Sequence, residues 1–288
     1  MITPGFSITL CIVFFMGSLS VSGLAASEAG FKGTLEKIKG SAKIVIGFRE
    51  SSPPLSYLDA DGNPAGFSID LCKQVATAVK EYLGLPKLAI EYRRVTPETR
   101  IKLLLDEEID IECGSTTITL TRLKKVDFSY PIFITGAVYL FKINKEIWNV
   151  ADLAGRRIAV VAGTTTEELI GKVLENQGID ASIVKVAEQK QGLLELERDR
   201  VDAFASDRII LLRLMKEAKQ PVELMLSEEF LSYEPYALML RRDGSDFRFL
   251  TNRTLARLYR SREIHKIYQK WFANLGGRQS ELLKAMYH

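Results

Sequence analysis

One stretch decides the fold: Cys113-Gly114-Ser115-Thr116-Thr117-Ile118-Thr119-Leu120-Thr121-Arg122. It follows a strand-like run over 109–112 and joins a glycine, a row of hydroxyl side chains and an arginine. Glycine lets the backbone approach a small molecule closely, and hydroxyls and backbone N–H groups bind carboxylate or phosphate oxygens. A guanidinium adds two parallel charge-assisted hydrogen bonds. The stretch could equally be a turn followed by a threonine-capped helix, so its context has to decide.

The length and composition indicate a folded chain of one or two domains with a sizeable core, since 47% of its 288 residues are hydrophobic. The formal net charge of +3 is small and the arginine pairs are isolated, which argues against a nucleic-acid partner. Two histidines, His265 and His288, and the lack of a Cys-x-x-Cys spacing argue against a metal site. We therefore expect neither a metal nor a cofactor.

The first 26 residues carry no charged side chain and contain an apolar run over 10–19, followed by small residues at 23–26. This pattern predicts a secretory signal peptide over 1–26 and a periplasmic location, although Lys and Arg are missing from its start. An uncleaved membrane anchor is the alternative.

Removal of that segment leaves two cysteines, Cys72 and Cys113. An even pair in an exported protein favours a disulfide, and the alternative is a pair of buried free thiols. Closure of such a loop, about forty residues long, would stabilise the fold by roughly 4 kcal/mol in the chain-entropy model.

Strand-like and helix-like segments alternate along the chain. Short runs rich in β-branched residues predict strands, and segments with apolar residues at helical spacing follow them. The strand-like runs are 42–48, 88–92, 158–161, 183–186 and 201–205. This alternation predicts an α/β fold with largely parallel sheets.

Charged and hydroxyl side chains follow the ends of these strands, where open α/β sheets bind ligands. Arg49 directly follows the first strand, and Asp207 follows the strand over 201–205. Arg100 lies in the first turn of a predicted helix, where a cation opposes the helix dipole, and such a broken local rule points to function. Thr166 is the predicted N-cap of a helix whose exposed N–H groups favour an anion.

From about residue 33 to residue 275 the chain resembles the family-3 periplasmic solute-binding proteins of polar amino-acid ABC transporters, and within them the glutamate/aspartate-binding branch. The matching segments are Arg49-Glu50-Ser51-Ser52, Gly66-Phe67-Ser68-Ile69-Asp70-Leu71, Thr99-Arg100-Ile101, Glu112-Cys113-Gly114-Ser115-Thr116-Thr117, Arg122, Phe128-Ser129, Gly163-Thr164-Thr165 and Lys270-Trp271-Phe272. The first and the fourth are fairly specific to that branch, whereas the last would be weak alone.

The resemblance implies the type II fold of periplasmic binding proteins, with two lobes joined by two crossover strands and the ligand bound between them. Lobe 1 would comprise 33–135 and 240–288, and lobe 2 would comprise 136–239 with the hinge strands. We expect the crossovers near 136–141 and 232–239. The resemblance further implies a monomer that binds an amino acid and delivers it to a membrane permease.

The resemblance also implies roles for residues that would hold the α-amino and α-carboxyl groups of an amino acid. Arg122 would clamp the α-carboxylate, helped by Thr117 and by Thr165 of the second lobe. Ser115 and Asp207 would hold the α-ammonium.

Recognition of the ligand's side chain would fall to Arg49 and Arg100, which would meet a second carboxylate. The charges agree with this independently, since three arginines and one aspartate complement two carboxylates and one ammonium. The branch often has a histidine where Gln189 stands and a serine where Pro97 stands. Gln189 can still donate a neutral hydrogen bond, but Pro97 has no donor, which leaves side-chain recognition open.

Two other functions are compatible with the same scaffold. A dehydratase-like enzyme would need a general acid or base in the cleft, and Glu50 and Glu112 are the acidic candidates near it. Since no histidine and no nucleophile–base pair is predicted there, we expect no enzyme. A ligand-binding sensor would use the same closing lobes, and sequence does not separate it from a transport receptor.

Overall fold

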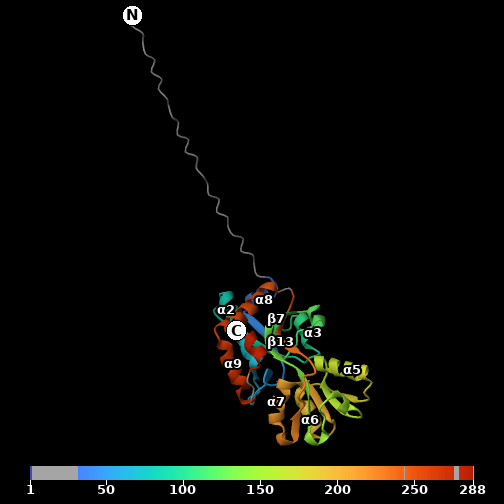
Figure 1. The fold of residues 1–288 in the computed structure, drawn as a ribbon. Coiled ribbons are helices and arrows are strands. Elements are labelled where there is room, and N and C mark those ends of the chain that lie inside the picture. Colours follow the sequence, from blue (N-terminus) through green and yellow to red (C-terminus); the bar gives the residue numbers. More distant parts are fainter. Residues whose placement is uncertain (2–31, 243, 276–278, 288) are drawn as a thin grey trace. The chain divides into compact units, whose positions relative to one another are not determined.

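The computed structural model describes Met1 and residues 32–242, 244–275 and 279–287 (Figure 1). Apart from Met1, the predicted signal peptide lies outside these residues. Among the helices of the described ranges, none is both long enough and apolar enough to cross a bilayer.

The first lobe is built on a sheet that has, in the described chain, the strand order β5-β1-β6-β13-β7. Its strands are β1 (Lys43–Phe48), β5 (Ala89–Arg94), β6 (Ile111–Glu112), β7 (Asp127–Thr135) and β13 (Glu234–Leu240). β1 lies parallel to β5 and β6, whereas β13 runs antiparallel to β6 and β7. The β-branched side chains of Ile44 and Ile46 are fully buried, which suits β1 to the inside of a sheet.

Helices cover this sheet and carry much of its core (Figure 1). The longest are α2 (Phe67–Tyr82), α8 (Ser245–Arg260) and α9 (Glu263–Phe272), with α2 packed on α8 and α9. In α2 the residues Leu71, Val75 and Val79 are buried at helical spacing, so one face of the helix enters the core. The shorter elements of this lobe are α1 (Thr34–Ser41), β2 (Ser51–Ser52), β3 (Ser56–Leu58), β4 (Pro64–Ala65), α3 (Arg100–Leu105), α4 (Leu120–Leu123), η4 (Ala273–Leu275) and α10 (Glu281–Met286).

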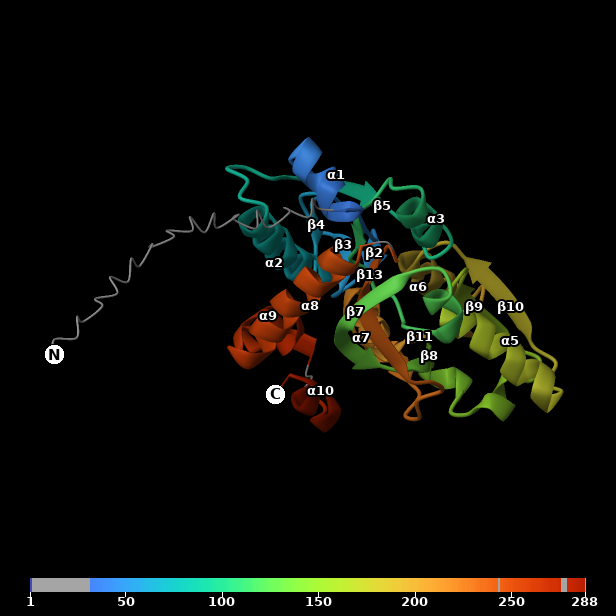
Figure 2. The same ribbon diagram turned by 90° about the horizontal axis from the view of Figure 1, so that it is seen from above.

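The second lobe repeats the theme with the strand order β10-β9-β11-β8-β12 in the described chain (Figure 2). Its strands are β8 (Ala137–Lys142), β9 (Arg157–Val161), β10 (Ser182–Val186), β11 (Ala203–Asp207) and β12 (Leu224–Leu226). β9 lies parallel to β10 and β11, and β8 runs antiparallel to β11 and β12. Its helical segments are α5 (Thr165–Gln177), α6 (Gln189–Glu197), α7 (Arg208–Glu217), η1 (Ile143–Lys145), η2 (Val150–Leu153) and η3 (Pro221–Glu223).

Two connections join the sheets and lie side by side. The chain passes from β7 to β8 at Gly136, and it returns between β12 and β13. The N–H of Ala137 donates to Ser232 Oγ at 3.1 Å, and the N–H of Leu231 donates to Ala137 O at 2.8 Å. A Cβ atom at Gly136 would lie 2.3 Å from Ser232 O, so this close approach requires glycine. The predicted two-lobed α/β fold is confirmed, and in both sheets parallel strands are accompanied by antiparallel ones.

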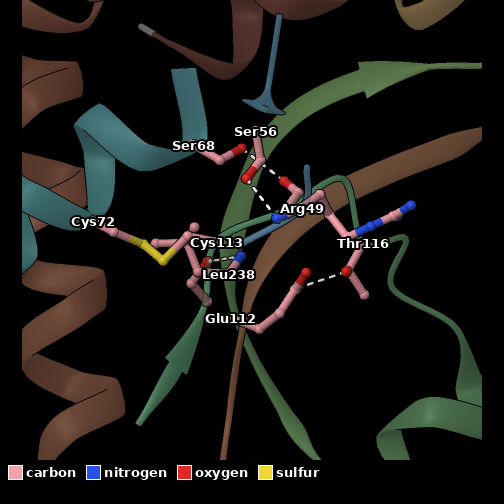
Figure 3. The surroundings of a disulfide bond; sticks show 10 residues. Arg49, Ser56, Ser68, Cys72, Glu112, Cys113, Thr116 and Leu238 are labelled. Atoms are coloured by element: carbon pink, nitrogen blue, oxygen red, sulfur yellow. Dashed lines mark hydrogen bonds between the residues drawn. A yellow bond between two sulfur atoms is a disulfide. The ribbon is translucent and has the colours of Figure 1, made fainter. Parts of the chain in front are cut away.

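The predicted disulfide between Cys72 and Cys113 is present, with the two Cα atoms 6.4 Å apart (Figure 3). Both cysteines are fully buried. The bond joins α2 to the residue directly after β6, where the stretch 113–122 begins. It therefore anchors this stretch to the main helix of the first lobe.

Candidate ligand-binding site

A small cavity brings together side chains from both lobes. Its lining contains every residue predicted for the site, and it consists of Arg49, Arg100, Ser115, Thr117, Arg122, Thr164, Thr165, Thr166, Gln189, Ser206 and Asp207. The sequence reasoning did not assign Thr164 or Ser206 to the site. The space that a water-sized sphere can enter is only about 10 Å³, roughly that of one water molecule. The lobes are therefore closed over the cavity, and a larger ligand needs them to part.

Arg49 follows the end of β1, and its own backbone N–H donates to Ser56 Oγ at 3.0 Å (Figure 3). Its side chain is 1% exposed, and Nη2 lies 2.9 Å from Oε2 of Glu188 in the second lobe. The Nε atom is buried and has no hydrogen-bond partner among the described residues. Because an unpaired buried donor is costly, this atom is available to an acceptor that enters the cavity.

Arg100 is the first residue of α3 and is 2% exposed. Its Nη1 donates to Thr116 Oγ1 at 2.5 Å. That hydroxyl donates in turn to Oε2 of Glu112 at 2.6 Å (Figure 3). Burial, followed by the neighbouring Arg122, lowers the pKa of Arg100 to about 9, so the guanidinium remains charged at neutral pH. As with Arg49, its buried Nε has no partner within the described ranges.

Arg122 lies on the short helix α4, whose N-cap Thr119 accepts a hydrogen bond from the backbone N–H of Arg122 at 3.1 Å. Its Nη1 donates to the carbonyl oxygen of Thr117 at 2.8 Å. Burial lowers the pKa of Arg122, while the carboxylates of Glu112 and Glu168 oppose that shift. The fold thus holds this cation in a desolvated place, which favours an anionic ligand there.

Asp207 ends β11 and faces the cavity from the second lobe. Its Oδ2 accepts a hydrogen bond from the hydroxyl of Tyr236, and its buried Oδ1 has no partner in the part of the chain that the structure describes. Burial and then the charge of Glu234 raise the pKa of Asp207 to about 7. An ammonium group placed at Oδ1 would satisfy this oxygen and stabilise the ionised form.

Glu234 is a site residue that the sequence reasoning missed. Its Oε2 accepts from Thr117 Oγ1 at 2.6 Å and from Thr165 Oγ1 at 2.8 Å, so one carboxylate joins hydroxyls of both lobes. Its Oε1 accepts from Ser232 Oγ at 2.7 Å. The only sequence signal was an acidic residue within a predicted crossover, directly before Pro235.

Glu188 is a second missed residue. Besides Arg49, its Oε2 accepts a hydrogen bond from Ser51 Oγ at 2.8 Å, and the N–H of Gln189 donates to Ser51 Oγ at 3.1 Å. Gln189 does line the cavity as predicted, and its Oε1 accepts from Ser206 Oγ at 2.9 Å. Residues 188 and 189 therefore bridge the lobes as a unit.

The predicted N-cap of α5 was wrong. The N-cap is Thr164, whose hydroxyl accepts a hydrogen bond from the N–H of Glu167, and Thr166 lies inside the helix.

The two acidic candidates for a general acid or base have protein partners. Glu50 pairs with Arg94 at 3.1 Å, and the buried Glu112 accepts a hydrogen bond from Thr116. A Cβ atom at Gly114 would lie 2.2 Å from Glu112 Oε1, which explains the glycine in the opening stretch.

The cavity thus combines three cationic side chains, several hydroxyls and one carboxyl group with an open acceptor position. Charge-assisted hydrogen bonds from guanidinium groups suit carboxylates, and Asp207 suits an ammonium group. Within the described ranges no group of three or more His, Cys, Asp or Glu side chains is arranged to hold a metal ion. The chemistry of the lining is therefore that of a site for a small zwitterion.

Comparison with known proteins agrees with this geometry. The chain is 37% identical over 263 residues to the L-glutamate/L-aspartate-binding protein of Pseudomonas aeruginosa, covering 88% of this chain and 87% of that protein. It is 36% identical to the glutamate/aspartate import solute-binding protein of Escherichia coli, with 87% and 82% covered. A crystal structure of the ancestral amino acid-binding protein AncCDT-1, a precursor of cyclohexadienyl dehydratase, superposes with a TM-score of 0.72 at 26% identity, covering 84% of this chain and all of that one.

A family model described as bacterial extracellular solute-binding proteins, family 3, matches residues 44–274. The match takes in both sheets except Lys43 of β1, and every residue that lines the cavity. The chain belongs to the family 3 bacterial extracellular solute-binding proteins.

Proposed function

We propose that this protein binds glutamate or aspartate between its two lobes in the periplasm and, as a monomer, presents it to the permease of an ABC transporter. One observation carries the proposal. The buried Nε atoms of Arg49 and Arg100 and the buried Oδ1 of Asp207 all lack partners among the described residues, and all three side chains line one cavity. A ligand with an ammonium group and two carboxylates would pair each of them.

The contacts within the cavity support a role for each predicted residue. Arg122 and the hydroxyls of Thr117 and Thr165 lie together and would bind the α-carboxylate. Asp207, with Ser115, would bind the α-ammonium. The hydroxyls of the two threonines now donate to Glu234. An incoming α-carboxylate would compete for these donors.

Arg49 and Arg100, whose buried Nε atoms have no partner among the described residues, would bind the side-chain carboxylate. The similarity to proteins named for glutamate and aspartate supports this assignment of the two arginines to a side-chain carboxylate. Entry requires the lobes to part, since the closed cavity holds little more than one water molecule. Closure would then bury the ligand and supply groups from both lobes, which is what a receptor that signals occupancy to a permease needs.

Calorimetric titration tests the proposal directly. We expect glutamate or aspartate to bind with micromolar or tighter affinity, on the order of 8 kcal/mol or more of binding free energy, and arginine not to bind. The absence of heat from both acids at millimolar concentration would refute the assignment. A sensor role would give the same binding curve, and the presence of a cognate permease that the loaded protein stimulates would favour transport.

A dehydratase-like activity is the second candidate, and one observation favours it. Burial raises the pKa of Asp207 to about 7, which suits a group that exchanges protons at neutral pH. Incubation with hydroxylated carboxylic acids, followed by chromatography, would reveal dehydrated products. Turnover that Asp207→Asn abolishes would favour the enzyme, and stable substrate over many hours would exclude it for the acids tested.

The raised pKa of Asp207 predicts that ligand affinity depends on pH. Below about pH 7 this carboxyl group is protonated in the ligand-free protein and must lose its proton before it pairs with the α-ammonium. We expect the dissociation constant to rise by up to about tenfold for each pH unit below 7, and to level off above it. Titrations from pH 5 to pH 8 in buffers of different ionisation enthalpy would also detect the released proton.

Asp207→Asn is the matched variant for this measurement. The amide cannot ionise, so its affinity should be lower than that of the wild type at pH 8 and nearly constant from pH 5 to pH 8. A flat profile for the wild-type protein would contradict the prediction.

A further inference from the structure

The two guanidinium groups proposed to bind the ligand's side-chain carboxylate each have a protein carboxylate nearby. Glu188 lies 2.9 Å from Arg49, and Glu112 is linked to Arg100 through the hydroxyl of Thr116. Each of these two cations is thus partly compensated by a protein carboxylate, and Glu112 also acts on the nearby Arg122. Such carboxylates offset the cost of burying the guanidinium groups, and each of them also opposes an incoming anion.

Arg49 and Glu188 share a single hydrogen bond rather than the two parallel ones that a guanidinium and a carboxylate can form. It uses Nη2 of the arginine and Oε2 of the glutamate, while Nε of Arg49 and Oε1 of Glu188 are buried and have no partner among the described residues. Arg49 therefore keeps a donor for the ligand while it remains paired with Glu188. A distal ligand group on Arg49 would share the guanidinium with that carboxylate.

A carboxylate and a carboxamide would respond differently to this neighbour. Both offer an oxygen that accepts from Arg49 or Arg100. Only the carboxylate carries a charge that Glu188 repels. Gln189, which lines the cavity, is neutral and adds no charge that would favour a carboxylate over an amide.

We infer that Glu188 sets the balance between acidic and amide side chains, so that the site also accepts glutamine or asparagine at a modest disadvantage. This inference rests on the proposed function of the same site. Glu188 is then a specificity residue of the second lobe. It contacts Arg49 and Ser51 of the first lobe and reduces the net positive charge near the distal group of the ligand.

The test compares glutamate with glutamine, which differ only in the distal group. Calorimetry of the wild type and of Glu188→Gln gives the ratio of the glutamine to the glutamate dissociation constant for each protein. Removal of the competing charge should raise this ratio roughly tenfold. An unchanged ratio, or one that moves in favour of glutamine, would overturn the inference.

The variant Ser51→Ala distinguishes an electrostatic role of Glu188 from a role in which Glu188 only holds the lobes together. This variant removes a hydroxyl that contacts Glu188 and the N–H of Gln189 but leaves every charge in place. It should weaken both ligands by the same factor and leave the ratio unchanged. Glu188→Ala provides a second removal of the charge, and circular dichroism establishes that each variant is folded. If the wild type binds neither ligand, the proposed function fails; if it binds them and the ratio does not respond, only the inference fails.

Discussion

Replacement of Arg122 by alanine is expected to weaken binding of the amino acid by about 100-fold or more. The half-buried guanidinium of Arg122 would form two charge-assisted hydrogen bonds with a carboxylate enclosed in the cavity, and loss of one partner from such an enclosed pair costs about 2–5 kcal/mol. The carbonyl oxygen of Thr117 accepts a hydrogen bond from Nη1 of Arg122 at 2.8 Å, which orients the guanidinium. Its loss would leave the α-carboxylate facing hydroxyls alone.

The same substitution should not lower the stability of the ligand-free protein. Burial lowers the pKa of Arg122, which means that the fold holds this cation at a cost in desolvation. Removal of the charge relieves that cost, so the melting temperature without ligand should stay the same or rise. Binding and stability are thus expected to move in different directions, which a general folding defect would not produce.

Two control variants sharpen the measurement. Arg122→Lys keeps the charge but loses the planar fork, so its affinity should lie between those of the wild type and the alanine variant. Arg253→Ala removes an exposed arginine of α8 outside the cavity and should bind like the wild type. Affinity of the Arg122→Ala protein within threefold of the wild type would rule out the assigned role.

Removal of the disulfide is expected to give the largest change in stability. Cys72 and Cys113 are separated by 41 positions, and closure of such a loop contributes roughly 4 kcal/mol in the chain-entropy model. For a domain of this size the melting temperature of the double variant Cys72→Ala/Cys113→Ala should fall by roughly 10 °C. Differential scanning calorimetry of the ligand-free protein measures the shift.

A reducing agent supplies the matched control for this prediction. Dithiothreitol should lower the melting temperature of the wild type toward that of the double variant and leave the double variant unaffected. The bond lies next to Gly114 and Ser115 of the opening stretch, so the ligand affinity of the reduced protein should also decrease. Equal melting temperatures of the wild type and the double variant in the absence of reductant would contradict the expected contribution.

The sequence predicted those site residues that local position singles out. Arg49 and Asp207 each mark the end of a buried strand, and Arg100 is a cation in the first turn of a helix, so single segments reveal them. The opening stretch revealed Arg122 in the same way, since a glycine and hydroxyls precede it. The resemblance to a family then assigned these residues to one cleft.

The two glutamates Glu188 and Glu234 could not be predicted as site residues, because no local pattern marks them. Glu188 and Arg49 lie 139 positions apart, and Glu234 and Thr117 lie 117 apart. Their proximity arises only when two sheets close on one another. Tyr236 is similar, since its hydroxyl meets Asp207 across the same gap between lobes. The sequence shows how many acidic residues the chain has, but not which of them lie near the arginines and threonines of the cavity.

The carboxylate of Glu234, which accepts hydrogen bonds from Thr117 and Thr165, has a consequence for how tightly an amino acid is held. Because these hydroxyls already have an acceptor, an arriving carboxylate gains only the difference between two similar hydrogen bonds. The two threonines should therefore orient the ligand more than they strengthen its binding. For a receptor of the proposed kind, such moderate retention favours release of the amino acid at the membrane.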